Sequence, residues 1–236
     1  MTGLQASGDT GVIVVAAGRG TRMGTVESKQ YLLLDGKPIF IHTLEVFRRH
    51  PWVSQIVLVT GKQDVERCRS WITEYGIGEQ IQVIPGGAER QDSVRQGLLH
   101  LSTPWVLVHD GVRPFVTSEQ ITACCEAVRT HGAAVLAVPV KDTIKQADAQ
   151  GFVAATPDRR SLWAIQTPQA FRRTDLLAAH ERAVAEGFVG TDDAMLVERL
   201  GIPVKLVEGA YDNIKITTPE DLDYAEFVRR KRRLRD

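Results

Sequence analysis

The first 140 residues alternate between short apolar runs and longer segments in which apolar residues recur every three or four positions. Residues 12–17 are wholly apolar and rich in Val and Ala, which is typical of a parallel strand buried on both faces. Similar runs predict strands at 54–60, 81–84, 105–109 and 133–140, and the periodic segments predict helices at 38–49, 64–75, 91–101 and 118–131. Strands that alternate with helices predict a mostly parallel sheet with helices on both faces.

The alternation of strand and helix patterns ends after residue 140. Residues 141–164 have no helical period and predict a β-hairpin with its turn at 149–151. Because an exposed two-stranded hairpin is marginally stable by itself, we expect it to project as an arm and to pack on another subunit. Ser118 and Thr191 are the expected N-caps of their helices. Beyond the hairpin, the pattern predicts helices at 173–186, at 192–200 and from Pro219 onward, and short strands at 204–207 and 213–216.

The first strand runs into a loop with three glycines and two arginines, Gly18-Arg19-Gly20-Thr21-Arg22-Met23-Gly24, and Lys29 follows a few residues later. Glycines let successive backbone N–H groups approach an anion, and the cations match a ligand with several negative charges. A P-loop needs Gly-Lys-Ser/Thr, which the sequence lacks, and a dinucleotide fingerprint needs its third glycine one residue earlier. The loop therefore favours a cradle for a nucleoside triphosphate whose phosphate is attacked, with an ordinary strand-to-helix turn as the alternative.

Other polar residues follow the ends of later strands, where ligands bind in open α/β sheets. The Gly86-Gly87 pair can let a nucleobase or ribose approach the backbone, and Ser93 lies near the start of the next helix. Asp110 and Arg113 follow an apolar strand, and Lys215 stands between two isoleucines. Taken singly, these residues also fit a glycine turn, a helix start, a turn-forming aspartate, a solvated arginine and an edge-strand lysine.

Charge, hydropathy and cysteine content indicate which partners and which cellular compartment to expect. The chain has 29 basic and 29 acidic residues, and six of the basic ones lie in the last eight positions, so the rest is mildly acidic. Contact of this basic tail with nucleic acid or an anionic lipid surface is the alternative to a solvated end of the last helix. Because no aromatic residues interleave with the charges, the solvated end is favoured and no nucleic-acid partner is expected. No apolar run reaches the length of a membrane span, and residues 1–11 do not resemble a signal peptide. Cys68, Cys124 and Cys125 have neither disulfide nor metal-ligand spacing. We therefore expect buried, reduced cysteines in a cytoplasmic protein without a membrane partner.

Taken together, the motifs resemble one family over nearly the whole chain. They are AAGRGTRMG, SKQY, GGAERQDSV, VHDGVRP, PVKDTIK, SLWAIQTPQAF, GTDDA and DNIKITTPEDL. In these the sequence is similar to the 2-C-methyl-D-erythritol 4-phosphate cytidylyltransferases of non-mevalonate isoprenoid biosynthesis. The first motif alone is typical of sugar-nucleotide transferases in general, whereas the late ones are much more specific. The family often has Pro directly before the lysine of SKQY, where this chain has Ser28.

The resemblance implies a Rossmann-like three-layer nucleotidyltransferase fold in a single domain over residues 1–236, with a projecting β-hairpin arm at 139–165 that forms a homodimer. It implies that CMP passes from CTP to 2-C-methyl-D-erythritol 4-phosphate, giving 4-diphosphocytidyl-2-C-methyl-D-erythritol and pyrophosphate. Mg²⁺ held mainly by the CTP phosphates would be the cofactor, without dedicated protein ligands. Ribitol 5-phosphate cytidylyltransferase is the alternative among enzymes, and a nucleotide-binding regulator without catalysis is the alternative outside them.

The same resemblance assigns roles to single residues. The catalytic residues would be Arg22, Lys29 and Lys215, which hold the triphosphate and stabilise charge at the α-phosphate. The residues around cytidine and the phosphates would be Ala16, Ala17, Gly18, Gly20, Gly86, Gly87, Ser93 and Asp110. The residues around the acceptor would be Asp110, Arg113, Thr143, Arg159, Thr167 and Thr191. Of these, Thr143 and Arg159 would reach the site of the neighbouring subunit.

Overall fold

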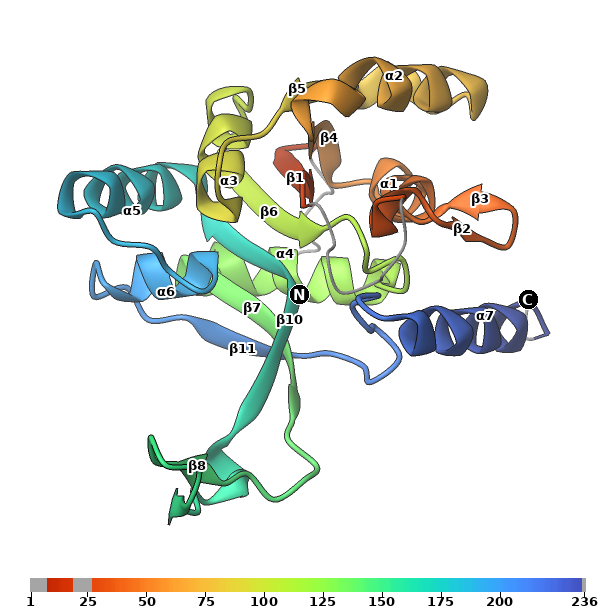
Figure 1. The fold of residues 1–236 in the computed structure, drawn as a ribbon. Helices are drawn as coiled ribbons and strands as arrows, with labels where there is room; N and C mark the ends of the chain where they lie inside the picture. Colours follow the sequence, from red (N-terminus) through yellow and green to blue (C-terminus); the bar gives the residue numbers. More distant parts are fainter. Residues whose placement is uncertain (1–7, 19–26, 235–236) are drawn as a thin grey trace, which may run out of the picture.

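A seven-stranded sheet forms the middle layer of the molecule (Figure 1). The computed structural model describes residues 8–18 and 27–234. In order across the sheet, the strands are β11 (Lys205–Glu208), β7 (Ala133–Pro139), β10 (Trp163–Arg172), β6 (Trp105–Asp110), β1 (Thr10–Ala16), β4 (Val53–Thr60) and β5 (Ile81–Pro85). β10 runs antiparallel to its neighbours β7 and β6, and the other pairs are parallel. The predicted mostly parallel sheet is confirmed.

Helices cover both faces of the sheet, as the sequence predicts (Figure 1). One face carries α1 (Ile39–Arg48), α2 (Val65–Glu74) and α4 (Ser118–His131), and the other carries α3 (Arg90–Leu99), α5 (Arg173–Glu186) and α6 (Asp193–Glu198). Val12 and Val14 of β1 pack in the apolar cluster on the first face, and Ile13 packs in the cluster on the second. Because successive strand residues point to opposite faces, burial of both faces explains why residues 12–16 of β1 are all apolar.

Smaller elements complete the chain. The final helix, α7 (Pro219–Arg233), packs on a third apolar cluster that includes Leu34 and Ile216. Pro219 occupies the first turn of α7, as predicted, and Thr218 caps the helix. The described chain also has the hairpin strands β2 (Leu33–Leu34) and β3 (Lys37–Pro38) and the 3-10 turns Lys29–Tyr31, Lys62–Asp64, Gly78–Gln80 and Arg159–Ser161.

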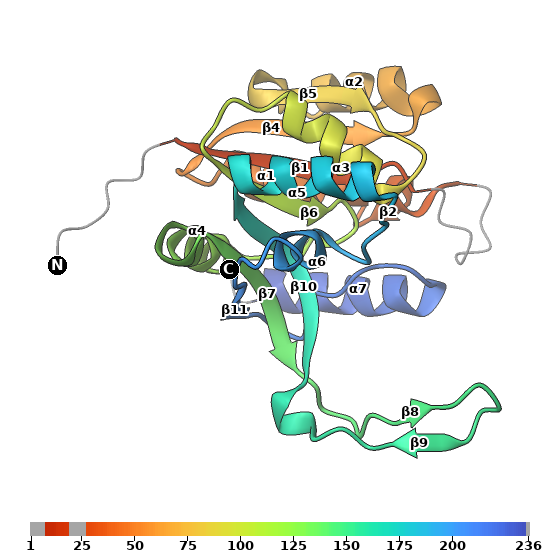
Figure 2. The ribbon, with the colours of Figure 1, turned by 90° about the vertical axis from the view of Figure 1, so that its left-hand side faces the viewer.

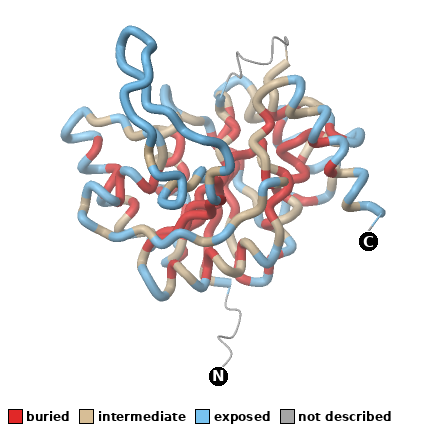
Figure 3. The backbone as a smooth tube through the Cα atoms, turned by 90° about the horizontal axis from the view of Figure 1, so that it is seen from below, coloured by how far each residue is buried: buried red, intermediate tan, exposed pale blue. Residues whose placement is uncertain are grey.

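The segment after β7 leaves the body of the molecule as an arm (Figures 2 and 3). Its two short strands, β8 (Gln146–Ala147) and β9 (Val153–Ala155), pair antiparallel. Residues 141–156 are all exposed, and the large side chain of Phe152 is 73% exposed. The projecting hairpin is therefore confirmed, and its use as a contact between subunits stays a prediction.

Residues 213–216 do not form the predicted strand. The Ile216 N–H donates to the Val112 carbonyl at 3.0 Å, and the Arg113 side chain donates to the Asn213 carbonyl at 2.9 Å. The segment is therefore bound to the loop after β6 and does not join the sheet. The alternation of apolar and polar residues reflects the packing of Ile214 and Ile216 on one apolar cluster, in which Ile216 has no exposed surface.

The two predicted N-caps are wrong by one residue. Thr117 precedes α4 and accepts from the Gln120 N–H at 3.3 Å, so Ser118 is the first helical residue and not the cap. Asp192, not Thr191, caps α6, and its side chain accepts from the Met195 N–H at 2.9 Å. In both helices the neighbouring side chain has the oxygen within reach of the third helical N–H, which decides the cap.

The expected state of the cysteines is confirmed, since Cys68, Cys124 and Cys125 are buried and form no disulfide. Burial raises the pKa of each of these thiols, so they are neutral at physiological pH. Among the described helices, none has the length and apolar character needed to cross a bilayer.

His109 of β6 is completely buried. Its Nε2 donates to the Arg113 carbonyl at 3.0 Å, and its ring packs against Phe47 with the ring centres 4.8 Å apart. Burial lowers the pKa of His109 from 6.5 to about 4. The unfolded chain therefore binds more protons here than the folded protein, so the contribution of His109 to stability is complete above pH 6.5 and is lost as the pH falls toward 4.

Replacing His109 with glutamine removes this titration. Between pH 7 and pH 4.5, we expect the free energy of unfolding of the unaltered protein to fall by about 2–3 kcal/mol more than that of His109→Gln. Denaturation at a series of pH values measures this difference, and the carboxylates cancel because both proteins contain them. His100→Gln, at an exposed position, is the matched control. The same pH dependence in all three proteins would contradict a neutral His109.

Candidate functional site

A first pocket opens over the carboxyl end of β1, between the 3-10 turn Lys29–Tyr31 and the loop before α3. The strand register brings its walls together, because Val15 pairs with Asp110 and Ala16 pairs with Thr60. The loops that follow β1, β4, β5 and β6 therefore meet at one edge of the sheet. This is the edge at which ligands bind in open α/β sheets.

A second pocket lies beside β10 and the start of α6, and it shares a wall with the first. Arg113, Thr167 and Thr191 are among its lining residues. The residues that line both pockets are Arg90, Asp110 and Lys215. A ligand in the first pocket and a ligand in the second therefore meet at these three charged side chains, which we call the shared wall.

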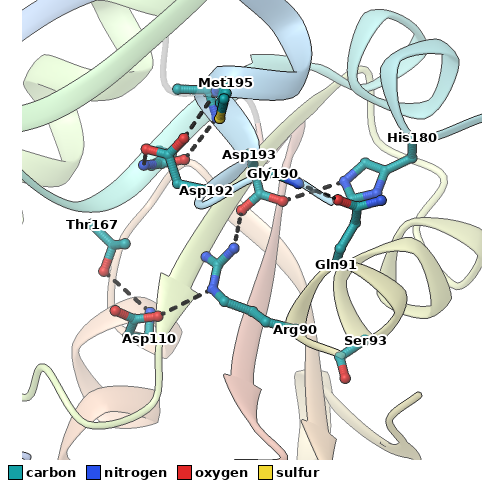
Figure 4. Close-up of polar contacts among 12 residues, drawn as sticks. Arg90, Gln91, Ser93, Asp110, Thr167, His180, Gly190, Asp192, Asp193 and Met195 are labelled. Carbon is teal, nitrogen blue, oxygen red and sulfur yellow. Dashed lines mark hydrogen bonds and ion pairs between the residues drawn. The ribbon is translucent and has the colours of Figure 1, made fainter. Parts of the chain in front are cut away.

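Asp110 is the anion of the shared wall, and Figure 4 shows it beside Arg90. Its carboxylate lies 3.0 Å from Lys215 Nζ, 3.4 Å from Arg113 Nε and 3.6 Å from Arg90 Nε. Burial would raise the pKa of Asp110, but the Lys215 ammonium and the two guanidinium groups hold it well below its usual range. Asp110 is therefore ionised at neutral pH, and it balances only part of the positive charge around it.

Lys215 reaches the shared wall because its segment is fixed on both sides. On one side, the Ile216 N–H donates to the loop after β6 at 3.0 Å. On the other, the Arg113 guanidinium donates to the carbonyl of Asn213, a residue with no exposed surface. The lysine is thus held at the wall while 37% of its side chain remains accessible to a ligand.

Gln30 joins the turn that carries Lys29 to the end of β1. The side chain is buried, and its Nε2 donates to the carbonyls of Ala16 at 2.8 Å and Gly18 at 3.1 Å. Both carbonyls belong to backbone that lines the first pocket. One amide group therefore fixes the turn that carries Lys29 to the end of β1, next to backbone that lines the first pocket.

Gln30→Glu keeps the shape of the side chain but replaces the donor with a carboxylate that faces two carbonyl oxygens. Because two buried acceptors lose their partner, we expect the affinity for a ligand of the first pocket to fall about tenfold. Calorimetric titration with CTP, the nucleotide that the sequence resemblance implies, measures the change. Gln55→Glu is the control, because Gln55 also binds backbone and side chain, at Ser102, but lies away from the pocket. Unchanged affinity in Gln30→Glu would contradict this role.

The Gly86-Gly87 pair allows the backbone to approach Ser93 closely. A Cβ at Gly86 would lie 2.6 Å from Ser93 Oγ and 2.8 Å from the Cβ of Ala17, and a Cβ at Gly87 would lie 2.3 Å from that of Asp92. Ser93 Oγ accepts from the Gly87 N–H at 3.2 Å. A larger residue at either glycine would therefore push apart the groups that line this end of the pocket.

Most of the predicted site residues are brought together at these pockets. Those lining the first are Ala16, Ala17, Gly18, Lys29, Gly87, Ser93, Asp110 and Lys215. Those lining the second are Asp110, Arg113, Thr167, Thr191 and Lys215. Gly86 lines an adjoining hollow that shares Ala17, Gly18 and Gly87 with the first pocket. Gly20 and Arg22 lie outside the described residues.

Thr143 and Arg159 are not brought to the site of their own chain. Both are exposed on the arm, and neither is among the described residues that line the two pockets. Arg159 instead donates to the Lys141 carbonyl at 2.7 Å, at the base of the arm. Their predicted contribution to the site of a neighbouring subunit stays a prediction.

Sequence reasoning missed Gln30, Arg90 and Asp193 as residues of the site. Arg90 Nη1 donates to Asp193 Oδ2 at 2.7 Å, across 103 positions of the chain. Each of the three lies within a motif, SKQY, GGAERQDSV or GTDDA, and the motifs are the signal that points to them. Their partners are distant in sequence, so the residue types alone do not reveal the contacts.

The arrangement suits chemistry at phosphate groups. Lysine and arginine side chains form strong charge-assisted hydrogen bonds with phosphate oxygens. Held in place, they also stabilise charge that grows in a transition state. Because the cations stand between two pockets, the geometry fits transfer of a phosphate-bearing group from one bound ligand to another.

Comparisons with known proteins agree with this geometry. The sequence model of the 2-C-methyl-D-erythritol 4-phosphate cytidylyltransferase family matches residues 10–231. The enzyme of that name from Bacillus velezensis is 51% identical over 219 residues, covering 92% of this chain and 94% of the relative. The one from Caldanaerobacter subterraneus is 47% identical over 222 residues, covering 93% and 98%.

Solved structures give the same result. The 4-diphosphocytidyl-2C-methyl-D-erythritol synthase of Anaerococcus prevotii superposes with a TM-score of 0.84 at 34% identity, covering 95% of this chain and 98% of that one. The 2-C-methyl-D-erythritol 4-phosphate cytidylyltransferase of Thermus thermophilus superposes with a TM-score of 0.76 at 33% identity, covering 93% and 98%. The chain belongs to the 2-C-methyl-D-erythritol 4-phosphate cytidylyltransferase family.

Proposed function

We propose that the shared wall is where this cytidylyltransferase joins its two substrates. The enzyme transfers CMP from CTP to 2-C-methyl-D-erythritol 4-phosphate and releases pyrophosphate. In this proposal CTP occupies the first pocket and the acceptor occupies the second. The single observation that supports it most is that Arg90, Asp110 and Lys215 line both pockets.

The reaction forms one bond and breaks another at the α-phosphorus of CTP. An oxygen of the acceptor's 4-phosphate attacks that phosphorus, and the bond to the β-phosphate oxygen breaks to release pyrophosphate. The phosphate oxygens gain charge as this happens, and the protein contributes mainly positioning and charge stabilisation. We assign these tasks to Lys29 at the triphosphate and to Lys215 at the α-phosphate. Arg22 is the third cation of this set.

The two ends of the joined substrates have different surroundings in this proposal. Cytidine lies against the backbone of Ala16, Gly18 and the Gly86-Gly87 pair, with Ser93 as a hydrogen-bonding partner. The acceptor lies in the second pocket, where the exposed Thr191 and the buried Thr167 offer hydroxyl groups to its phosphate and hydroxyls. Two observations support this orientation. A Cβ at Gly86 or Gly87 would clash, so the backbone there is open to a close approach by the nucleoside, and the second pocket is lined mostly by polar residues.

Mg²⁺ fits the donor set of the first pocket as a partner of CTP. The carboxylate at the shared wall, Asp110, already faces Lys215 and two arginines, so phosphate oxygens would supply most of the ligands. No group of three His, Cys, Asp or Glu residues suited to a metal occurs within residues 8–18 and 27–234. When bound, the ion neutralises triphosphate charge and orients the leaving group.

We extend the proposal to a cytoplasmic homodimer, in which the arm of each subunit completes the acceptor site of the other subunit. Its exposed apolar residues, Phe152 and Val153, would be covered by the second copy. Arg159 and Thr143, which are remote from their own chain's pockets, would then bind the acceptor's phosphate across the interface. The exposure of the arm and its separation from the body support this arrangement (Figures 2 and 3).

Mixed dimers test the exchange of arms. Lys215→Met inactivates the site of its own subunit, and Arg159→Ala inactivates the site into which its arm reaches. We expect each variant to be nearly inactive alone, and co-expression of both to restore roughly a quarter of the activity, because half of randomly mixed dimers regain one native site. An inactive mixture, with dimers confirmed by ultracentrifugation, would contradict arm exchange.

An assay of pyrophosphate release tests the function itself. We expect release when the purified protein receives Mg²⁺, CTP and 2-C-methyl-D-erythritol 4-phosphate, and only background release when ribitol 5-phosphate replaces the acceptor. Equal release with ribitol 5-phosphate would favour the alternative enzyme, which the comparisons do not support. Calorimetric binding of CTP without release of pyrophosphate would favour a regulator.

A further inference from the structure

Arg90 bridges the two pockets through a partner that lies outside the predicted site. It is the first residue of α3, directly after the loop of the first pocket. Its Nη1 donates to Asp193 Oδ2 at 2.7 Å, whereas its Nε lies 3.6 Å from Asp110 Oδ1, beyond a normal hydrogen bond (Figure 4). Asp193 is therefore the main partner of Arg90, although Asp110 is the anion of the shared wall.

Asp193 is built into the body of the molecule. Its side chain is 1% exposed, and its second oxygen, Oδ1, lies 3.3 Å from Nε2 of His180, which is fully buried in α5. A buried carboxylate is costly unless charged or polar groups compensate it. Asp193 is the first residue of α6 and follows Thr191 and Asp192, which line the second pocket. Its carboxylate thus ties the acceptor side of the site to a guanidinium from the nucleotide side.

We infer that Asp193 is a positioning residue, which holds Arg90 at the wall between the two pockets and thereby fixes the Thr191 segment relative to bound CTP. The inference rests on the proposed placement of CTP and the acceptor in these pockets. Asp193 itself does not line either pocket among the described residues, so it acts through Arg90. The ion pair therefore joins α3 to α6 next to the place where, in the proposed function, the acceptor's phosphate meets the α-phosphate of CTP.

The charges on the shared wall explain why this link matters. Without the carboxylate of Asp193, the nearest anion for Arg90 is Asp110, which already faces Lys215 at 3.0 Å and Arg113 at 3.4 Å. Arg90 would then compete with Lys215 for one carboxylate. The start of α6 would also lose its bond to α3, so the acceptor pocket would be less well defined. The hydrogen bonds of Gln169 to Asp192 and to the N–H of residue 194 would still hold the helix in place.

Asp193→Asn preserves the size of the side chain and removes its charge. We expect kcat/KM for the acceptor to fall about tenfold or more, while KM for CTP changes less than about twofold. Arg90→Gln is expected to give a similar loss, and the double variant a loss no greater than either single one, because one link is broken in all three. Glu45→Gln, which removes a partly buried ion pair with Lys37 away from the site, is the matched control.

Four outcomes decide the inference. A split between the two substrates together with non-additive losses supports it. Additive losses, or an active Asp193→Asn enzyme with unchanged kcat/KM for the acceptor, would overturn it. Equal losses for CTP and for the acceptor in soluble Arg90→Gln would also overturn it, and this variant decides the matter where Asp193→Asn does not fold. An unaltered protein that releases no pyrophosphate would instead refute the proposed function.

Discussion

Lys29→Met is expected to lower turnover by about 10²–10³-fold while CTP affinity falls much less, because a fixed cation acts mainly on charge that develops in the transition state. Lys29 opens the 3-10 turn beside the end of β1 and lines the first pocket with Asp110 and Lys215. Gln30, the next residue, fixes this turn to the carbonyls of Ala16 and Gly18. The lysine is thus held next to backbone that lines the first pocket, where we propose that CTP binds.

Steady-state rates of pyrophosphate release give turnover, and calorimetric titration with CTP gives affinity. Lys205→Met is the matched control, because Lys205 is an exposed lysine at the far edge of the sheet, and it should leave both values unchanged. If Lys29→Met weakens CTP binding by the same factor as it lowers turnover, the lysine only anchors the ground state.

Asp110→Asn is expected to have the second large effect, a loss of turnover of about 10²-fold. The amide cannot balance the Lys215 ammonium 3.0 Å away, nor the Arg113 and Arg90 guanidinium groups. These cations then repel one another, and Lys215 no longer has a fixed position between the two pockets. We expect the free energy of unfolding to fall by about 2 kcal/mol, since the cations keep partial access to water.

Rates of pyrophosphate release and chemical denaturation measure the two effects of Asp110→Asn separately. Asp175→Asn, in a surface pair with Arg172, is the control and should change neither by a measurable amount. Stability that falls while turnover stays the same would mean that Asp110 serves the fold only. In that case the carboxylate of the shared wall would have no part in the reaction, which would contradict the proposed role of the wall.

Most of the sheet could be predicted from the sequence, because its buried parallel strands are short apolar runs with a glycine or polar loop after them. β1 is the clearest example, since Val12, Ile13 and Val14 have no exposed surface. β10 was not predicted as a strand. Its residues from 166 to 170 are buried but include Gln166, Thr167 and Gln169, whose polar groups are satisfied only in the folded protein.

The candidate site was predictable where backbone form and charge stand together in one motif. The Gly86-Gly87 pair and the pair of Asp110 and Arg113 are of this kind. The contacts of Gln30 and the Arg90–Asp193 pair were not predictable, because their partners lie 12 to 14 and 103 positions away. The false strand at 213–216 has the same origin, since its backbone bonds to the loop after β6 are long-range and leave no local pattern.

A crystal structure of the enzyme with its product, 4-diphosphocytidyl-2-C-methyl-D-erythritol, tests the central claim most directly. We predict that the cytidine lies over the Gly86-Gly87 backbone, that the diphosphate lies at Lys215 between the pockets, and that the methylerythritol extends toward Thr167 and Thr191. A diphosphate bound away from Lys215 and Asp110, or a product confined to one of the two pockets, would contradict the account.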